Sequence, residues 1–398
     1  MRLSFWMTAF AFTSSLATNV AQAQTVEIMW AGSEHLSLGE SGAFAACRDL
    51  GISKADCPVI NIPRADKKVS FRYGEMLMSA DFYNSPDELY VDKRKGIKHV
   101  IECTHKEIHG ESSASCNNLG TIIAMPKYLG VVTKNYNHFG WYNMKDYVKY
   151  HQQAIDKALE SYELRDSNPA KSVTLFQQAM VANAFADHYL TDAFSSGHVR
   201  VPRVQVVEWA KQNLKGFLKK NRGDLLTMLM HDNESINLRT GADDGLPVAN
   251  SQGDKWVTRG DGHLHIDENP FDPVRVHPEN AVRESVKEVL IAGLYGIEPT
   301  ATFAAAWIVP FHQDLPMSEK FSPEHQQMTK MKLVNSFFKK QPIIRATPFV
   351  RYDLGLCLGA LPQIFSEFRK AVNKDIKADP ELSRRLPAGY VEAFRNVN

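Results

Sequence analysis

The stretch NPAKSVTLFQQAMVANAFADHYLTDAFSSG, residues 168–197, decides the fold. Its apolar residues recur at spacings of three and four, which predicts a helix with one apolar face. Pro169 suits the first turn of that helix, and Gly197 is typical of its end. The preceding segment MKDYVKYHQQAIDKALESY, which starts at Met144, has the same period. Two long helices in succession predict a mainly α fold.

The remaining segments of the chain are predicted to contain further helices, one long loop or hairpin, and an irregular N-terminal part. Further helices are predicted in VQVVEWAKQNLKGFLKK, GDLLTMLMHD, PENAVRESVKEVLIAGLYG and LGALPQIFSEFRKAV. Residues 233–273 are rich in Gly, Asp and Asn, which indicates a long loop or a short hairpin. Residues 25–130 mix Gly and Pro with short apolar runs, so we expect irregular structure with one or two helices, one of them over Tyr73–Phe82.

The first residues, MRLSFWMTAFAFTSSLATNVAQAQ, have the pattern of an export signal. Arg2 precedes an apolar run, and small residues lead up to a cleavage position after Ala23. The run is shorter than the roughly 20 residues that span a bilayer, which argues against a membrane anchor. We therefore predict a signal peptide over residues 1–23 and a mature chain in the periplasm or outside the cell.

An exported chain can form disulfides, and four of the five cysteines lie close in sequence. Local pairing predicts a bridge from Cys47 to Cys57 and another from Cys103 to Cys116, with Cys357 as a buried thiol. The chain has 46 basic and 45 acidic residues, so no long-range field attracts nucleic acid or an anionic membrane. Any phosphate group must be bound by a local site.

Two imidazoles and a carboxylate cluster at the end of the opening stretch. His188 and Asp192 are four residues apart, so on a helix they share one face and could hold one metal ion. A carboxylate has two oxygens, so Asp192 could also bridge two ions. His198 follows Gly197, where its ring can turn toward a neighbouring ion. The alternative is a surface pair or a core histidine with an ordinary hydrogen-bond partner.

His188-Tyr-Leu-Thr-Asp192, followed by His198, resembles the His-Tyr-Leu-Gly-Asp stretch of the bacterial zinc-dependent phospholipases C. Their superfamily also contains zinc-dependent single-strand nucleases. NYNHFG resembles the Ser/Asn-His-Phe segment of that family, which implies that His138 binds the same zinc. SADFY resembles an Ala-Asp-Tyr-like segment, which implies that Asp81 completes this zinc and serves as a base.

The resemblance extends to two further zinc positions. In MLMHDNES it implies His231 as a ligand together with Glu234 or Asp232, although the family spacing of four falls on Ser235. In MWAGSEHLSLG it points to Trp30 and His35. Cleavage after Ala23 leaves Trp30 internal, where its amide nitrogen cannot ligate. Three alternatives remain for this third zinc position. The N-terminus is trimmed further so that Trp30 comes first, or the site is built from Glu34 and His35 instead, or the site is absent.

The resemblance therefore implies two or three zinc ions. The first is held by Asp81, His138, His188 and Asp192, the second by His198, His231 and Glu234, and a third by His35 with Asp192. It also implies that residues 24–298 form a multi-helix catalytic domain of the phospholipase C type with long loops. Residues 299–398 are then a C-terminal helical extension, which packs on the domain or touches lipid through Trp307 and Phe311.

The expected activity is cleavage of the glycerol-side phosphodiester of a phospholipid such as phosphatidylcholine, at a membrane or micelle surface. The products are diacylglycerol and a phosphorylated head group. One alternative is a single-strand nuclease or nucleotidase, which the balanced charge disfavours because such proteins usually have a basic groove. The other is a secreted binding protein with structural zinc, although closed structural sites commonly use cysteine. We expect no nucleic-acid partner.

Two other groups of residues are candidates for a lesser role. His263 and His265 alternate as in a strand, and together with Asp261 they form a candidate site. His151 lies on the predicted helix beside the main site and could orient a ligand. The chain contains no GxSxG, HExxH or Walker motif, so hydrolysis assisted by a metal is the reaction class that remains.

Overall fold

The structure is a computed structural model, and it describes most of the chain beyond residue 31. The described ranges are 32–59, 61–65, 70–92, 96–111, 116, 118–132, 135–235, 245–264, 271–299, 301–312, 316–320 and 350–398. The predicted signal peptide, residues 1–23, lies outside them, as do Trp30 and His265.

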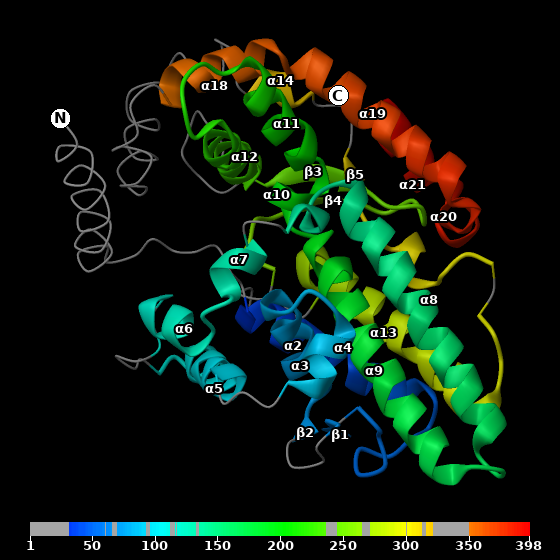
Figure 1. Cartoon of the computed structure of the whole chain (residues 1–398). Helices are drawn as coiled ribbons and strands as arrows, with labels where there is room; N and C mark the ends of the chain where they lie inside the picture. The colour runs from blue at the N-terminus through cyan, green and yellow to red at the C-terminus, as the bar shows by residue number, and fades with distance from the viewer. Residues whose placement is uncertain are drawn as a thin grey trace.

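Two long antiparallel helices form the centre of the fold, as predicted, and Figure 1 shows them side by side. They are α8 (Trp141–Leu164) and α9 (Pro169–Asp192). Asn168 caps α9 by accepting a hydrogen bond from the backbone N–H of Lys171, and Pro169 occupies the first turn. Every residue from Ala179 to Asp192 is buried, so this half of α9 is surrounded by protein on all sides.

The end of α9 differs from the prediction, which placed it at Gly197. The helix stops at Asp192, and the chain turns through Phe194 and Ser195 before a short separate helix, α10 (Ser196–Val199). The backbone N–H of Ser196 donates to the carbonyl of Arg259, a residue beyond the helix ladder, which accounts for the break. His198 therefore approaches the end of α9 from its own helical turn.

The segment before α8 is more helical than its composition predicts. Its helices are α2 (Gly32–Asp49), α3 (Tyr73–Ser79), α4 (Pro86–Val91), α5 (Gly96–Ile108), α6 (Asn118–Ala124) and α7 (Tyr128–Val132). Two 3-10 turns, η1 (Ala80–Phe82) and η2 (Tyr136–His138), and a two-strand pair, β1 (Ile62–Pro63) with β2 (Ser70–Phe71), connect them. Helices α2 and α3 pack on each other and on α9.

Helix α13 (Pro273–Tyr295) lies against α2, α8 and α9 and completes the central layer. It starts at a cap formed by Asp272 and ends at Gly296, whose left-handed backbone suits glycine. Its long contact with α2 excludes larger residues at Gly42, because a Cβ there would lie 2.7 Å from Val282. The N-terminal helix that carries His35 is thereby fixed next to α9.

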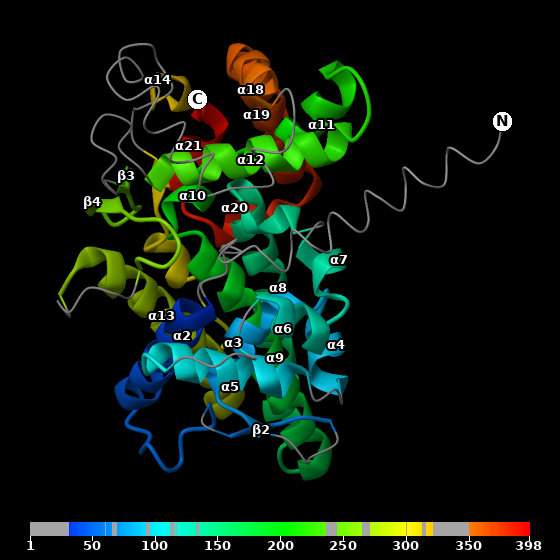
Figure 2. The ribbon, with the colours of Figure 1, turned by 90° about the vertical axis from the view of Figure 1, so that its left-hand side faces the viewer.

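Above this layer, the chain forms α11 (Arg203–Asn213), α12 (Lys219–Ser235) and the predicted hairpin of β3 (Leu246–Ala249) and β4 (Lys255–Thr258). A third strand, β5 (Phe311–His312), pairs with β3 after the 3-10 turn η3 (Ala305–Trp307) and is followed by α14 (Met317–Lys320). Figure 2 shows α12 lying across the end of the central helices, directly over α10.

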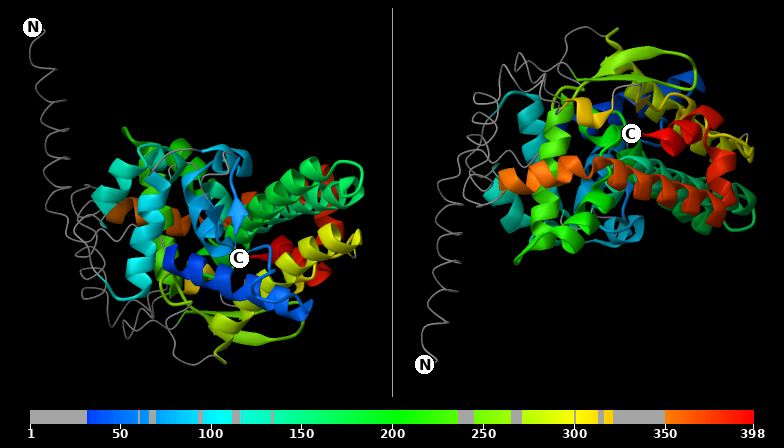
Figure 3. Two further views of the ribbon diagram at one scale, coloured as in Figure 1. Left: turned by 90° about the horizontal axis from the view of Figure 1, so that it is seen from below. Right: turned by 90° about the horizontal axis from the view of Figure 1, so that it is seen from above.

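The C-terminal residues form α18 (Val350–Gly359), α19 (Leu361–Ala378), α20 (Pro380–Arg385) and α21 (Ala388–Asn396). Seen from above in Figure 3, α18 and α19 run across the top of the molecule. They pack on α12 and α11, and their apolar residues belong to the same buried cluster as those of α8 and α9. Trp307 is 41% exposed, whereas Phe311 is partly buried against Tyr390.

Both predicted disulfides are present, Cys47–Cys57 and Cys103–Cys116, and Cys357 is a buried free thiol. Burial raises the pKa of this thiol to about 12. Among the helices that the structure describes, none has the length and apolar character that crossing a bilayer requires.

Candidate metal centre

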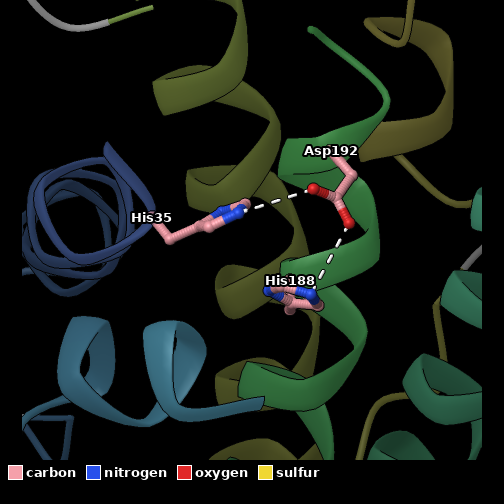
Figure 4. A group of neighbouring side chains, drawn as sticks. All are labelled: His35, His188 and Asp192. Carbon is pink, nitrogen blue, oxygen red and sulfur yellow. Dashed lines mark ion pairs between the residues drawn. The ribbon is translucent and has the colours of Figure 1, made fainter. Parts of the chain in front are cut away.

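The end of α9 provides the centre of the site. His188 and Asp192 share one face of the helix, and His188 Nε2 lies 3.5 Å from Asp192 Oδ2. His35 from α2 approaches from the opposite side, with its Nε2 3.4 Å from Asp192 Oδ1, as Figure 4 shows. The rings of His35 and His188 are 4.6 Å apart. We name His35, His188 and Asp192 the first cluster.

The second cluster consists of Asp81, His138 and His188, from η1, η2 and α9. His188 Nε2 is 3.4 Å from Asp81 Oδ1 and 3.3 Å from His138 Nδ1. His138 Nδ1 also lies 2.8 Å from Asp192 Oδ2. Two imidazole nitrogens and two carboxylates therefore converge on one point, which is the ligand set predicted for the first zinc.

The third cluster consists of His198, His231 and Asp261, from α10, α12 and the loop after β4. His231 Nε2 is 3.3 Å from Asp261 Oδ2, and His198 Nε2 is 3.6 Å from the same oxygen. Ser195 donates to the other oxygen of Asp261. In each of the three clusters, one ligand atom from every residue lies within 4.8 Å of the others.

At the third cluster, the hydrogen bonds of His198 and His231 fix which ring nitrogen faces Asp261. His198 Nδ1 lies 2.7 Å from the carbonyl of His138, and a carbonyl only accepts, so Nδ1 carries the proton. His231 Nδ1 donates in the same way to Asp232 Oδ1 at 3.1 Å. The neutral forms of both rings therefore direct an Nε2 lone pair at Asp261.

His35 has the same arrangement at the first cluster. Its Nδ1 lies 2.8 Å from the hydroxyl of Thr191, whose own proton goes to the carbonyl of Asp187. Nδ1 must then donate, and Nε2 presents a lone pair to Asp192. A lone pair and a carboxylate repel each other unless a cation lies between them, either a proton or a metal ion. Histidines that donate from one nitrogen and ligate with the other are typical of metal sites.

The charges of the carboxylates favour a cation. Burial by itself would raise the pKa of Asp192, but His188 and His138 hold it well below its usual range. The pKa of Asp261 is lowered in the same way by His198 and His231, against the effect of burial. For the His231 imidazole, burial has the opposite sign and would lower the pKa. In the absence of metal, Asp261 and Asp232 outweigh burial and raise the pKa of His231 to about 10. The third cluster then holds a proton that a metal ion would displace.

Unpaired buried atoms fit the same interpretation. Among the residues that the structure describes, Asp81 Oδ2 and His188 Nδ1 are buried without a hydrogen-bond partner. Buried polar atoms are nearly always paired, and each unpaired one calls for an explanation such as a bound ion or water. The three clusters could hold metal ions. His188 belongs to both the first and the second, and Asp192 Oδ2 of the first lies 2.8 Å from His138 Nδ1 of the second.

The structure brings together seven of the eight predicted ligands, and the remaining one, Glu234, lies elsewhere. Its side chain is fully buried and accepts hydrogen bonds from the guanidinium of Arg200, at 3.1 Å from Nε and 3.0 Å from Nη2. A buried carboxylate and a buried guanidinium each need a counter-charge, and this pair satisfies both. Asp261 occupies the acid position beside His198 and His231 instead.

Asp261 is the site residue that sequence reasoning assigned to the wrong neighbours. The sequence predicts a separate candidate site of Asp261, His263 and His265, but His263 is exposed and His265 lies outside the described residues. The hairpin of β3 and β4 carries Asp261 back to α10, where the N–H of Ser196 binds the carbonyl of Arg259. This contact depends on tertiary structure, so no local spacing in the sequence indicates it.

His151, predicted to orient a ligand, belongs to a separate buried network. Its ring nitrogens bind Asn183 Oδ1 and Glu288 Oε2, the latter at 2.9 Å. Asn183 also donates to the hydroxyl of Tyr73, which in turn donates to Asp187. Burial raises the pKa of Asp187 to about 7. This network joins α3, α8, α9 and α13 behind the clusters and touches none of their ligand atoms.

Gly197 gives a direct test of how His231 is positioned. A Cβ at this position would lie 2.3 Å from Cδ2 of the His231 ring, so either the ring or the backbone must shift. We expect Gly197→Ala to move the ring away from Asp261 and to remove one metal ion per chain, without unfolding the helices. Metal content by elemental analysis and helicity by circular dichroism check both parts. Gly355→Ala, where open space surrounds the glycine, is the matched control.

Comparisons of the chain with known protein families, with curated proteins and with solved structures find no match.

Proposed function

We propose that this chain is an exported zinc-dependent phosphodiesterase that cleaves phospholipids in the manner of a phospholipase C. The observation that carries the proposal is the set of three adjoining clusters with imidazole and carboxylate ligands and no thiolate. Zinc accepts these ligand types, and sites without cysteine that extend over several ions are typical of hydrolytic rather than structural zinc. Two disulfides are compatible with the proposed export.

The proposed ligands divide among the clusters. Asp81, His138, His188 and Asp192 would hold one zinc, and His198, His231 and Asp261 would hold another. His35 would hold a third with Asp192. When bound, zinc neutralises the anionic oxygens of a phosphodiester, lowers the pKa of water and stabilises the leaving alkoxide.

The chain itself supplies the base. His188 and His138 lower the pKa of Asp81 against the effect of burial, so its carboxylate stays ionised at neutral pH. The side chain is 13% exposed, more than those of His138, His188 and Asp192, and its Oδ2 has no partner among the described residues. Asp81 Oδ2, buried and without a partner, would accept the proton of an attacking water, while His188 Nε2 lies 3.4 Å from the other oxygen, Oδ1.

The test is hydrolysis of phosphatidylcholine by the purified mature chain, with and without a zinc chelator, beside single-stranded DNA. We expect release of diacylglycerol that the chelator stops and added zinc restores. Degraded DNA with intact lipid would keep the metal centre and move the chain to the nuclease class. Zinc binding with neither substrate cleaved would support a secreted binding protein with structural zinc.

A further inference from the structure

The connection between α11 and α12 exposes apolar side chains. Phe217 is 80% exposed and Leu218 is 55% exposed, although Leu214, a few residues before them, is buried. Figure 2 shows this connection at the outer edge of the molecule, at one end of α12. Adjacent exposed apolar residues at a projecting turn mark an interaction surface more often than a scattered single one does.

The backbone at this turn is also strained. Leu218 has a φ of 56°, and it is the only residue other than glycine with a positive φ in the described part of the chain. A branched side chain is disfavoured in this left-handed region, where glycine is at no disadvantage. Exposure and strain both cost free energy, and strained residues of this kind concentrate at functional positions.

Basic residues surround the apolar tip. The twelve residues from Lys211 to Arg222 contain five basic and no acidic side chains, in a chain whose net charge is +1. Neither Lys215 nor Lys219 takes part in an ion pair with any residue that the structure describes, whereas Lys211 and Lys220 pair with acidic residues outside this segment. The positive charge is therefore local: Lys215 is exposed beside Phe217, whereas Lys219 is partly buried and its Nζ donates to the carbonyl of Lys211 at 3.4 Å.

The turn is held in place by Arg222. Its Nη1 donates to the carbonyl of Lys215 at 2.6 Å, and its Nη2 lies 2.6 Å from Asp353 Oδ1 on α18. The tip is thus fixed between two helices and not left to fray. A rigid tip loses little conformational entropy when it binds a surface.

We propose that residues 214–220, the docking turn, attach this protein to anionic lipid bilayers. Phe217 and Leu218 would enter the boundary between head groups and acyl chains, and Lys215 and Lys219 would contact anionic head groups. The inference rests on the proposed function, because docking would bring the chain to the bilayer that contains its proposed phospholipid substrate. Docking would hold the metal centre near that surface, since His231 lies on the same helix, about 18 Å along α12 at 1.5 Å per residue.

A bilayer fits this surface better than a nucleic acid. Single-strand binding uses aromatic side chains along a basic groove, and each base stacks on a flat ring. Here the second exposed residue is a leucine, which offers no stacking face, and the apolar pair stands at a projecting turn and not in a groove. Binding of an oligonucleotide is accordingly an outcome that would overturn the proposal.

The experiment is co-sedimentation of the full mature chain with vesicles of phosphatidylcholine containing phosphatidylglycerol, with and without chelator. We expect the double variant Phe217→Ser/Leu218→Ser to reduce the partition coefficient by about 30-fold, from the apolar surface lost. The double variant Lys215→Glu/Lys219→Glu is expected to reduce the partition coefficient by about 25-fold at low salt, because each lysine removed costs about fivefold. Phe271→Ser, at a residue that is 83% exposed elsewhere, is the matched control and should change nothing.

Leu218→Gly separates docking from folding. Glycine relieves the left-handed strain, so the melting temperature should not fall, whereas vesicle binding should weaken by about fivefold. A structural role for Leu218 predicts the opposite, a lower melting temperature with unchanged binding. Unchanged vesicle binding in the double Ser variant, or binding of an oligonucleotide with no binding of vesicles, would overturn the proposal.

Hydrolysis of a short-chain phosphodiester dissolved as monomers is measured on the same samples. The Ser variants should retain it, because they leave the metal ligands intact. Vesicle binding that depends on Phe217 together with no hydrolysis of any phosphodiester would refute the proposed function and leave docking standing. Hydrolysis with vesicle binding that ignores Phe217 would refute docking alone.

Discussion

Replacing Asp192 by alanine is expected to abolish phosphodiester hydrolysis and to lower the zinc content of the chain. Asp192 lies within 4.0 Å of ring nitrogens of His35, His138, His188 and His198, more histidines than any other carboxylate of the site contacts. Removing it takes the carboxylate from the first cluster, removes the oxygen that lies 2.8 Å from His138 Nδ1 of the second, and leaves these imidazoles without their shared counter-charge. We expect kcat/KM to fall by at least about 10³-fold, because even the outer partners of metal ligands are worth about 10–100-fold.

The measurement combines zinc content, activity on phosphatidylcholine and the melting temperature. Asp192→Asn keeps the shape of the side chain and should lose activity as fully as the alanine variant, since an amide carries no charge to hold the ion. Asp375→Asn, which alters a carboxylate on α19 that binds Lys145, should leave zinc content unchanged. Full activity in both Asp192 variants would refute the site.

Asp261 and Glu234 are expected to respond in opposite ways to loss of charge. Asp261→Asn removes a carboxylate that faces His198 and His231, so it should cost one zinc ion per chain and most of the activity. Glu234→Gln leaves Arg200 buried beside a neutral amide. Breaking a buried ion pair by removing one charge costs about 3–5 kcal/mol, so this variant should lose stability before it loses zinc.

Zinc content and urea unfolding of the two variants distinguish these effects. Removing both charges, in Arg200→Met/Glu234→Leu, should recover much of the stability that Glu234→Gln loses, because buried ion pairs can be replaced by apolar groups at little cost. If Glu234→Gln instead lost one zinc at unchanged stability, Glu234 would be the ligand, as the sequence predicts, and Asp261 would not.

The features that the sequence predicts well are those fixed by local spacing. The repeat in residues 168–192 dictates α9, and the interval of four places His188 and Asp192 on one face regardless of the remaining fold. Cys47 with Cys57 and Cys103 with Cys116 are likewise neighbours in sequence, so short loops bring them together. The α-rich architecture follows from the same periodicity.

Other features depend on contacts that no local pattern encodes. Glu234 follows His231 by three positions and so lies on the same face of the helix, and from spacing alone Glu234 or Asp232 is the natural acid partner. The fold instead uses Glu234 to neutralise Arg200 and brings Asp261 across from the hairpin. Helix α9 ends at Asp192 for a similar reason, since Ser196 binds Arg259 and does not extend the helix.

The wide separation of the clustered residues along the chain has a consequence for how the protein matures. They lie on α2, η1, η2, α9, α10, α12 and the loop after β4, so the first cluster is complete in sequence only at Asp192 and the third only at Asp261. Contacts between distant segments form late and slowly, because long loops must close first. We therefore expect metal capture to follow the closure of these long loops, so that a retained ion would show that the segments of its cluster have come together.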